Sequence, residues 1–203
     1  MKIILVRHGE SVDDTINCYG GAADFALSET GKKEAIVLAE TFKEVQVDKI
    51  YSSPLKRAKQ TAEKIEAVKQ CGITEISDLR ERNSYGVISG CSKEDCKDIY
   101  GYLIDNIKGK LGDYYSDEVL LGAELHLEFD ERIEAVINGI IQDAKANGYE
   151  NIVVVTHGNV TRSIYQNILK FEKKIDLDHL AKTVMTYNNE TFTLVFNEGV
   201  YEK

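Results

Sequence analysis

Short apolar runs alternate along the chain with longer stretches that have helical periodicity. Four apolar runs rich in β-branched residues predict buried strands at residues 2–7, 49–51, 73–79 and 152–155. Four stretches whose apolar residues recur every three or four positions predict helices at about residues 28–45, 53 onward, 124–146 and 160–169. Strands that alternate with helices are typical of a mostly parallel sheet covered on both faces. We therefore expect an α/β protein built as a three-layer α/β/α sandwich.

Capping residues and turn signals mark the ends of these elements. Ser28 is placed to cap one helix, and Ser53 stands before a proline at the start of the next. An Asn-Gly pair at residues 147–148 ends the long helix. Two further apolar runs within residues 183–196 flank the polar turn at 188–190 and predict a C-terminal antiparallel hairpin.

The inner faces of the three longer helices supply a predicted core. These residues are Ala35, Leu38, Ala39 and Phe42, then Leu55, Ala58, Ala62 and Ile65, and then Phe129, Ile133, Val136, Ile137, Ile140 and Ala144.

Residues 83–123 interrupt the alternation of strands and helices. The stretch is acidic, rich in tyrosine and only weakly helical. Long insertions of this kind are commonly lids or functional loops, and the alternative is a solvated excursion packed on the body through a few tyrosines. We expect a lid that belongs to a single domain spanning residues 1–203.

Composition and charge narrow the class of protein. The chain has 203 residues, of which 43% are hydrophobic, and this is enough to bury a core without help from disulfide bonds or structural metal ions. No apolar run approaches the roughly 20 residues that cross a bilayer, and the first strand begins without a leader pattern. The formal net charge of −9 disfavours nucleic acid and anionic membranes as partners. We expect a cytoplasmic protein.

Two histidines occupy matching positions at the ends of predicted strands. Arg7-His8-Gly9 follows the apolar run at residues 3–6, and Thr156-His157-Gly158 follows the run at 152–155. The carboxyl ends of parallel strands share one edge of an open sheet, and ligands bind at that edge. Because the chain has only four histidines, two in this setting indicate one common site.

Arginines accompany both histidines. Arg7 directly precedes the first histidine, and Arg162 lies in the helix after the second. Arg57 lies in the first turns of a helix, near free N–H groups and the positive end of the helix dipole. Arg82 follows the third predicted strand. Guanidinium groups match phosphate oxygens in planar, bidentate geometry, so this set predicts a pocket for a phosphate dianion.

Several blocks of the sequence resemble one known family. Residues 5–11 (LVRHGES) are similar to the signature of the histidine phosphatase superfamily, the phosphoglycerate mutase-like proteins. Residues 52–62 (SSPLKRAKQTA) and 155–160 (VTHGNV) resemble its second and third blocks, and residues 24–31 match the stretch before its first helix. The blocks occur in family order over most of the chain. The resemblance implies a phosphoglycerate mutase-like fold.

The resemblance also implies a mechanism. His8 would be the nucleophile and form a phosphohistidine, since a neutral imidazole nitrogen can attack phosphorus. Arg7, Arg57 and His157 would hold the phosphoryl oxygens, and such positioning and electrostatics carry most of phosphoryl transfer. Neither a metal nor another cofactor is implied.

A general acid is required as well, because an alkoxide is a poor leaving group at neutral pH. The family takes this acid from a glutamate after the third strand, which points to Glu81 here. It would protonate the leaving oxygen and then activate water. Asp78 is the alternative proton donor.

Further residues are expected to contact the substrate. The family's phosphate-contacting asparagine falls on Asp14, which would repel phosphate, so Asn17 is expected to replace it. Glycines after the first block and residues at the start of the helix after the third block can offer backbone amides. The full set of expected substrate-binding residues is Asn17, Gly20, Gly21, Arg82, Gly158 and Asn159.

The expected function is metal-independent hydrolysis of a small phosphate monoester, so the expected partner is a small phosphorylated metabolite. A cofactor-dependent phosphoglycerate mutase is the first alternative, although this chain has no tryptophan and the family's mutases share a tryptophan-rich segment. A non-catalytic phosphoryl-binding regulator is the second. A metallohydrolase is disfavoured because metal-ligand spacing such as HExxH is missing. The acidic insertion disfavours a bisphosphate.

Overall fold

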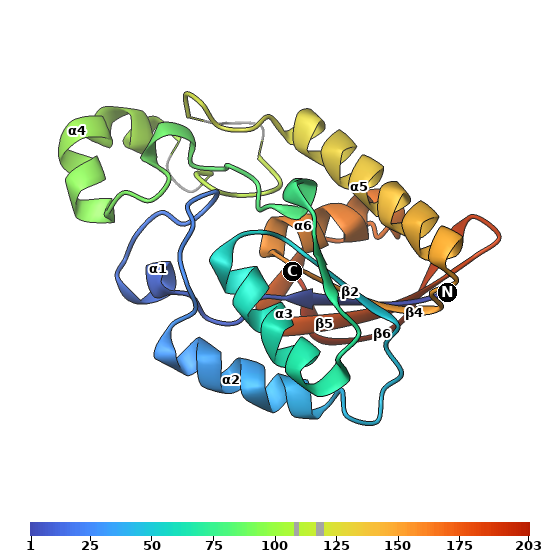
Figure 1. Ribbon diagram of the computed structural model, residues 1–203. Coiled ribbons are helices and arrows are strands. Elements are labelled where there is room, and N and C mark those ends of the chain that lie inside the picture. Colours follow the sequence, from blue (N-terminus) through green and yellow to red (C-terminus); the bar gives the residue numbers. More distant parts are fainter. Residues whose placement is uncertain (108–109, 117–119) are drawn as a thin grey trace.

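The computed structural model describes residues 1–107, 110–116 and 120–203, and a six-stranded sheet lies at its centre (Figure 1). The spatial order is β3-β2-β4-β1-β5-β6, with the first four strands parallel and the last two antiparallel. The strands are β1 (Lys2–Arg7), β2 (Lys49–Ser52), β3 (Ile73–Glu75), β4 (Asn151–Thr156), β5 (Ile175–Asn188) and β6 (Thr191–Glu202). This is the mostly parallel sheet with a C-terminal hairpin that the sequence predicts.

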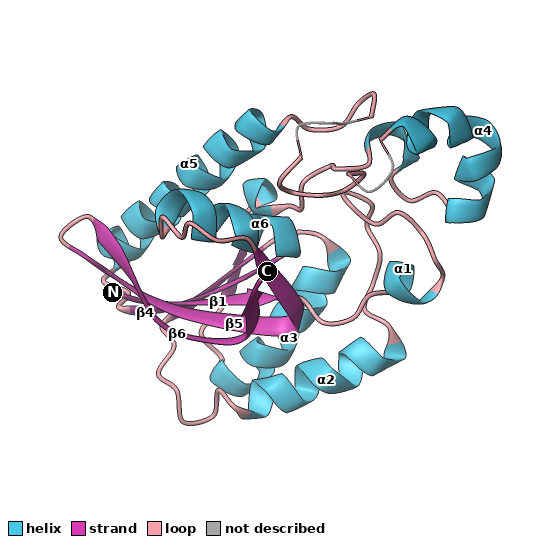
Figure 2. Ribbon diagram, turned by 180° about the vertical axis from the view of Figure 1, so that it is seen from behind, coloured by secondary structure: helices cyan, strands magenta, loops and turns pink. Residues whose placement is uncertain are grey.

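Helices cover both faces of the sheet and complete the expected three layers (Figures 1 and 2). On one face lie α2 (Glu29–Glu40) and α3 (Lys56–Lys69). On the other lie α5 (His126–Asn147) and α6 (Gly158–Ser163), which continues into the π-helical turn η3 (Ile164–Ile168). The short helix α1 (Val12–Thr15) and helix α4 (Lys93–Asn106) lie beyond one end of the sheet.

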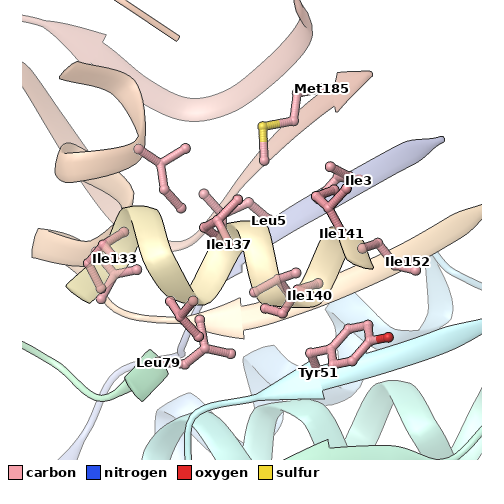
Figure 3. Close-up of a cluster of buried hydrophobic side chains, with 14 of the residues drawn as sticks. Ile3, Leu5, Tyr51, Leu79, Ile133, Ile137, Ile140, Ile141, Ile152 and Met185 are labelled. Carbon is pink, nitrogen blue, oxygen red and sulfur yellow. The ribbon is translucent and has the colours of Figure 1, made fainter. Parts of the chain in front are cut away.

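Two apolar clusters fill the space between the layers. Figure 3 shows α5 laying Ile133, Ile137 and Ile140 against Ile3 and Leu5 of β1. On the opposite face, side chains of α2 and α3 pack on alternate residues of the same strands. Every predicted core residue is buried except Leu55, which is half-buried.

Several element boundaries differ from the prediction. The helix that Ser28 caps ends at Glu40 rather than near Val45, since the chain turns from residue 41. The next helix begins at Lys56 and not at Ser53, because the Ser53 N–H is still bonded to the Val155 carbonyl at 3.0 Å.

The third strand and the final hairpin also differ in length. β3 has three residues and passes into the 3₁₀ turn η1 (Ser77–Leu79), so the predicted strand at 73–79 is too long. The hairpin strands are longer than predicted. A register shift between Leu177 and Lys182 breaks the alternation that would have marked them in the sequence.

The insertion at residues 83–123 begins with the 3₁₀ turn η2 (Gly86–Ile88) and contains α4. It has a small apolar cluster of its own around Ile88, Cys96 and Leu120. Backbone hydrogen bonds tie it to the loop after α1: Tyr19 N–H to Cys91 O (3.0 Å), Gly90 N–H to Tyr19 O (2.6 Å) and Lys93 N–H to Asn17 O (3.0 Å). Parts of this insertion, residues 108–109 and 117–119, lie outside the described residues.

No helix in the described ranges is both long and apolar enough to cross a membrane.

Truncation of the α5 core should be costly. Ile137 is 2% exposed, and Ile137→Ala should lower the free energy of unfolding by about 2–5 kcal/mol because a cavity is left beneath the helix. Val37 of α2 is 68% exposed, so Val37→Ala should change that free energy by no more than about 0.5 kcal/mol. Urea unfolding measures both, and equal losses would contradict the packing described here.

Candidate active site

The carboxyl ends of β1 and β4 bring the two strand-end histidines together. The strands are neighbours in parallel register, with Arg7 opposite Thr156, so the residue that follows each strand reaches the same edge of the sheet. The ring centroids of His8 and His157 lie 5.1 Å apart in an edge-to-face arrangement. Both side chains are buried. Residues about 150 positions apart in the chain thus form one site.

His8 is held as a neutral imidazole with a defined tautomer. Its Nδ1 lies 2.7 Å from the Gly9 carbonyl, which can only accept, so Nδ1 carries the proton. Its Nε2 therefore has a lone pair, which accepts a hydrogen bond from Arg57 Nε at 3.1 Å. Burial, together with the nearby charges of Arg57 and Arg7, lowers the pKa of His8 well below its usual value. A neutral imidazole with a free nitrogen is the form that can act as a nucleophile.

Arg57 is fixed in place by backbone carbonyls. Its Nη1 donates to Ala23 O and its Nη2 donates to Gly21 O, both at 2.7 Å. Gly21 has a φ of +55°, and a Cβ there would lie 2.9 Å from the Tyr85 ring, so this position favours glycine. The sequence predicts that Gly21 offers an amide to substrate, whereas the structure uses its carbonyl to orient Arg57.

His157 packs against the His8 ring and is fully buried. Its Nε2 is 2.8 Å from Ser53 Oγ, and its buried Nδ1 meets no hydrogen-bond partner within the described part of the chain. Burial, then the charge of Arg57, lowers the pKa of His157 well below its usual value. If the Ser53 hydroxyl donates to Nε2, an Nδ1–H group is left over that can donate to a further acceptor.

A polar cavity of about 400 Å³ opens at this edge of the sheet. Most of the expected site residues line it: Arg7, His8, Asn17, Gly20, Gly21, Arg57, Glu81, Gly158 and Asn159. Arg162, which the sequence places near the second histidine, lines it as well. The insertion contributes Tyr85, Lys93 and Gly112, so it forms part of the wall.

One cavity arginine has an unused donor. Arg7 donates from Nη1 to the Leu177 carbonyl at 2.5 Å, while its Nε is buried with no acceptor among the described residues. A buried donor without a partner costs about 1–3 kcal/mol, so an oxyanion at this position would be stabilised. The described residues hold no cluster of three or more potential metal ligands.

Glu81, rather than Asp78, is the carboxylate that reaches the cavity. Glu81 is buried, and its two oxygens accept from the Arg82 N–H at 2.8 Å and the Asn159 N–H at 3.2 Å. Asp78 points outward and pairs with Arg80 at 2.8 Å. Of the two carboxylates considered from sequence as proton donors, Glu81 is the one that lies at the cavity.

The structure corrects the expectation for Arg82. This side chain does not line the cavity, although its neighbour Glu81 does. It is 1% exposed, with Nε donating to Glu124 O at 3.1 Å and Nη1 to Tyr114 O at 3.3 Å. Arg82 thus ties the insertion to the segment before α5 and does not face the cavity.

The loop after β1 brings two acidic residues, Asp13 and Asp14, to the cavity. Asp14 Oδ2 accepts from the N–H and hydroxyl of Ser11 and lies 3.3 Å from His179 Nε2. Burial opposes ionisation, but the hydrogen bonds from His179 and Ser11 prevail and lower the pKa of Asp14. Asp13 also lines the cavity. Neither Asp13 nor Lys93 carries a sequence signal that would have identified it, because both lie outside the family blocks.

The comparison with known families identifies the class. The family model for the histidine phosphatase superfamily (branch 1) matches residues 3–198, and the chain belongs to this superfamily.

Individual relatives include phosphatases and mutases. The metal-independent phosphoserine phosphatase of Arabidopsis thaliana is 33% identical, over 82% of this chain and 68% of that protein. The solved structure of the α-ribazole phosphatase from Shigella flexneri matches with a TM-score of 0.77 at 22% identity, covering 96% of this chain and 95% of that one. A phosphoglycerate mutase from Bacillus anthracis matches with a TM-score of 0.76 at 23% identity, covering 96% and 91%. The fold is therefore phosphoglycerate mutase-like, as expected.

The buried histidines should make stability depend on pH. Because the folded-state pKa of His8 and of His157 lies below the usual 6.5, the unfolded chain binds more protons once the pH falls below that value. The free energy of unfolding should therefore be independent of these two histidines above about pH 6.5. Below that pH it should decrease, by up to about 1.4 kcal/mol per pH unit for each histidine.

Urea unfolding at about pH 7.5 and about pH 5.5 checks this dependence. His8→Gln cannot titrate, and its amide oxygen can replace Nε2 as the acceptor from Arg57, so this variant should lose less stability between the two pH values than the wild type. An equal loss in both proteins would contradict the burial of a neutral His8.

Proposed function

We propose that this protein is a phosphatase that hydrolyses small phosphate monoesters through a phosphohistidine on His8. The observation that carries the proposal is the neutral His8, whose Nε2 lone pair faces the Arg57 guanidinium at the cavity. The identity to a metal-independent phosphoserine phosphatase supports the same activity. Arg7 and Arg57 flank His8 and would repel a cation, so we expect the reaction to proceed without a metal.

In the first half of the proposed reaction, His8 Nε2 attacks the phosphorus atom and the bond to the ester oxygen breaks. The Arg57 Nε–H group donates to His8 Nε2 in the free protein, and during the reaction it donates its hydrogen bond to a phosphoryl oxygen instead. The unused Nε–H of Arg7 donates a hydrogen bond to a second phosphoryl oxygen, and the Nδ1–H of His157 can donate to a third. Glu81 gives its proton to the departing alkoxide. Preorganised donors of this kind stabilise the charge that develops in the transition state.

In the second half, water attacks the phosphohistidine and Glu81 accepts its proton. Inorganic phosphate leaves, His8 returns to its neutral form, and Glu81 is protonated again for the next cycle. The two backbone amides that hold the Glu81 carboxylate keep it at the cavity through both half-reactions.

The charges of the cavity favour hydrolysis over the mutase alternative. A mutase of this family must bind a bisphosphate donor and keep it from water. Asp13 and Asp14 stand on the cavity wall, where they would oppose a second phosphate group. A non-catalytic regulator would have no need for a buried carboxylate, Glu81, and a neutral His8 at the same cavity. The cytoplasmic location stays a prediction from sequence.

Truncation of His8 should abolish the turnover of p-nitrophenyl phosphate, and truncation of Arg57 should slow it. His8→Ala lacks the nucleophile and should be inactive. Arg57→Ala loses a transition-state donor and should lower kcat by about a hundredfold, equivalent to about 3 kcal/mol. Val37→Ala, on the outer face of α2, is the folding control. Activity that survives in His8→Ala would overturn the proposal.

A variant of the general acid should separate the two half-reactions. p-Nitrophenolate leaves without protonation, so Glu81→Gln should form the phosphoenzyme readily but hydrolyse it slowly. Rapid mixing should then give a burst of nitrophenolate close to one equivalent, with phosphate trapped on His8 in acid-labile form. Asp78→Asn is the matched control and should turn over without a burst. A missing burst in Glu81→Gln would remove Glu81 from the second step.

Chelation should leave the activity unchanged. Extended dialysis against EDTA removes loosely and moderately held metals, and arginine-based phosphate binding does not need them. Equal kcat/KM before and after dialysis is the expected result. Loss that zinc or magnesium restores would favour a metallohydrolase.

A further inference from the structure

The cavity is also lined by two groups of opposite charge that the proposed reaction does not use. Asp13 comes from α1 and Lys93 from the first residue of α4. Both were absent from the sequence-based site. Their shared presence in one cavity bears on the organic part of the substrate.

Asp13 has an unused oxygen. Its Oδ1 is buried and accepts no hydrogen bond from the described residues. The neighbouring Asp14 differs, because its carboxylate is already engaged by Ser11 and His179. Asp13 is therefore the carboxylate left to receive a donor from a ligand.

Gly20 provides the space that Asp13 occupies. A Cβ at residue 20 would come within 2.0 Å of Asp13 Oδ2, so any larger residue would displace the carboxylate. Gly20 does not have a positive φ, so its backbone conformation does not require glycine. A Cβ at this position would therefore fit only if the Asp13 carboxylate moved.

Lys93 is the complementary cation. Its backbone is anchored to the loop after α1 through the bond from Lys93 N–H to Asn17 O. Its Nζ lies 5.8 Å from the centroid of the Tyr19 ring, and no carboxylate of the described chain lies within ion-pair distance of it. A lysine ammonium is a compact point charge that suits a single carboxylate.

We infer that the substrate is an O-phosphorylated amino acid whose ammonium group binds Asp13 and whose carboxylate binds Lys93. The inference rests on the proposed function, which places the phosphate at Arg7 and Arg57. The cavity volume of about 400 Å³ suits a molecule of that size. A neutral sugar phosphate would use neither charged group, and a bisphosphate would face the carboxylate of Asp13.

Four phosphate esters separate the two contacts. O-Phosphoserine has both groups, phosphoethanolamine has only the ammonium, phosphoglycolate has only the carboxylate, and p-nitrophenyl phosphate has neither. Wild-type kcat/KM should be highest for O-phosphoserine. Asp13→Asn should lower kcat/KM by about tenfold for the two ammonium-bearing esters only. Lys93→Met should do the same for the two carboxylate-bearing esters only, and Lys97→Met, on the same helix, is its matched control.

The outcomes distinguish this inference from the proposed function. One contrary result is that Asp13→Asn lowers kcat/KM equally for all four esters, and another is that Lys93→Met gives the same kcat/KM values as Lys97→Met. Either result would contradict the binding of a zwitterionic substrate by Asp13 and Lys93. Turnover of p-nitrophenyl phosphate that depends on His8 would persist in that case. If His8→Ala still hydrolyses p-nitrophenyl phosphate, the proposed function itself is wrong.

Discussion

The hydrogen bond from Arg57 Nε to His8 Nε2 is the contact on which the arrangement of the site depends. One guanidinium connects the end of β1, the start of α3 and the loop at residues 21–23. The same loop is held from the other side, since the Arg57 N–H donates to Phe25 O and the Lys56 N–H donates to Asp24. Three segments of the chain therefore meet at this one side chain.

This arrangement also sets the charge state of the histidines. Two imidazoles lie within a few ångströms of each other and of guanidinium groups, and both rings are buried. Protonation of either ring would add a charge to a desolvated, already cationic place. The fold thus keeps the histidines neutral by burial first and by arginine charge second. The positive charge needed to attract phosphate is left to arginine, whose guanidinium stays protonated.

Much of the fold, and the part of the cavity around His8 and His157, could be predicted from local sequence patterns. The rest of the cavity could not. Apolar runs before His8 and His157 identify two strand ends, and parallel pairing places those ends side by side. The start of α3 was misplaced because Ser53 continues the sheet pairing, which no capping pattern reveals. Arg82 was misplaced because its direction depends on partners at Tyr114 and Glu124, far along the chain.

The backbone hydrogen bonds between the insertion and the loop after α1 have a consequence for engineering. These hydrogen bonds join the loop after α1, at residues 17 and 19, to the insertion, at residues 90, 91 and 93. The two segments therefore form one structural unit that includes Lys93. Transplanting the insertion alone into a relative would leave those amides and carbonyls facing foreign partners. A chimera intended to transfer ester preference would have to exchange residues 13–21 together with the insertion, as one cassette.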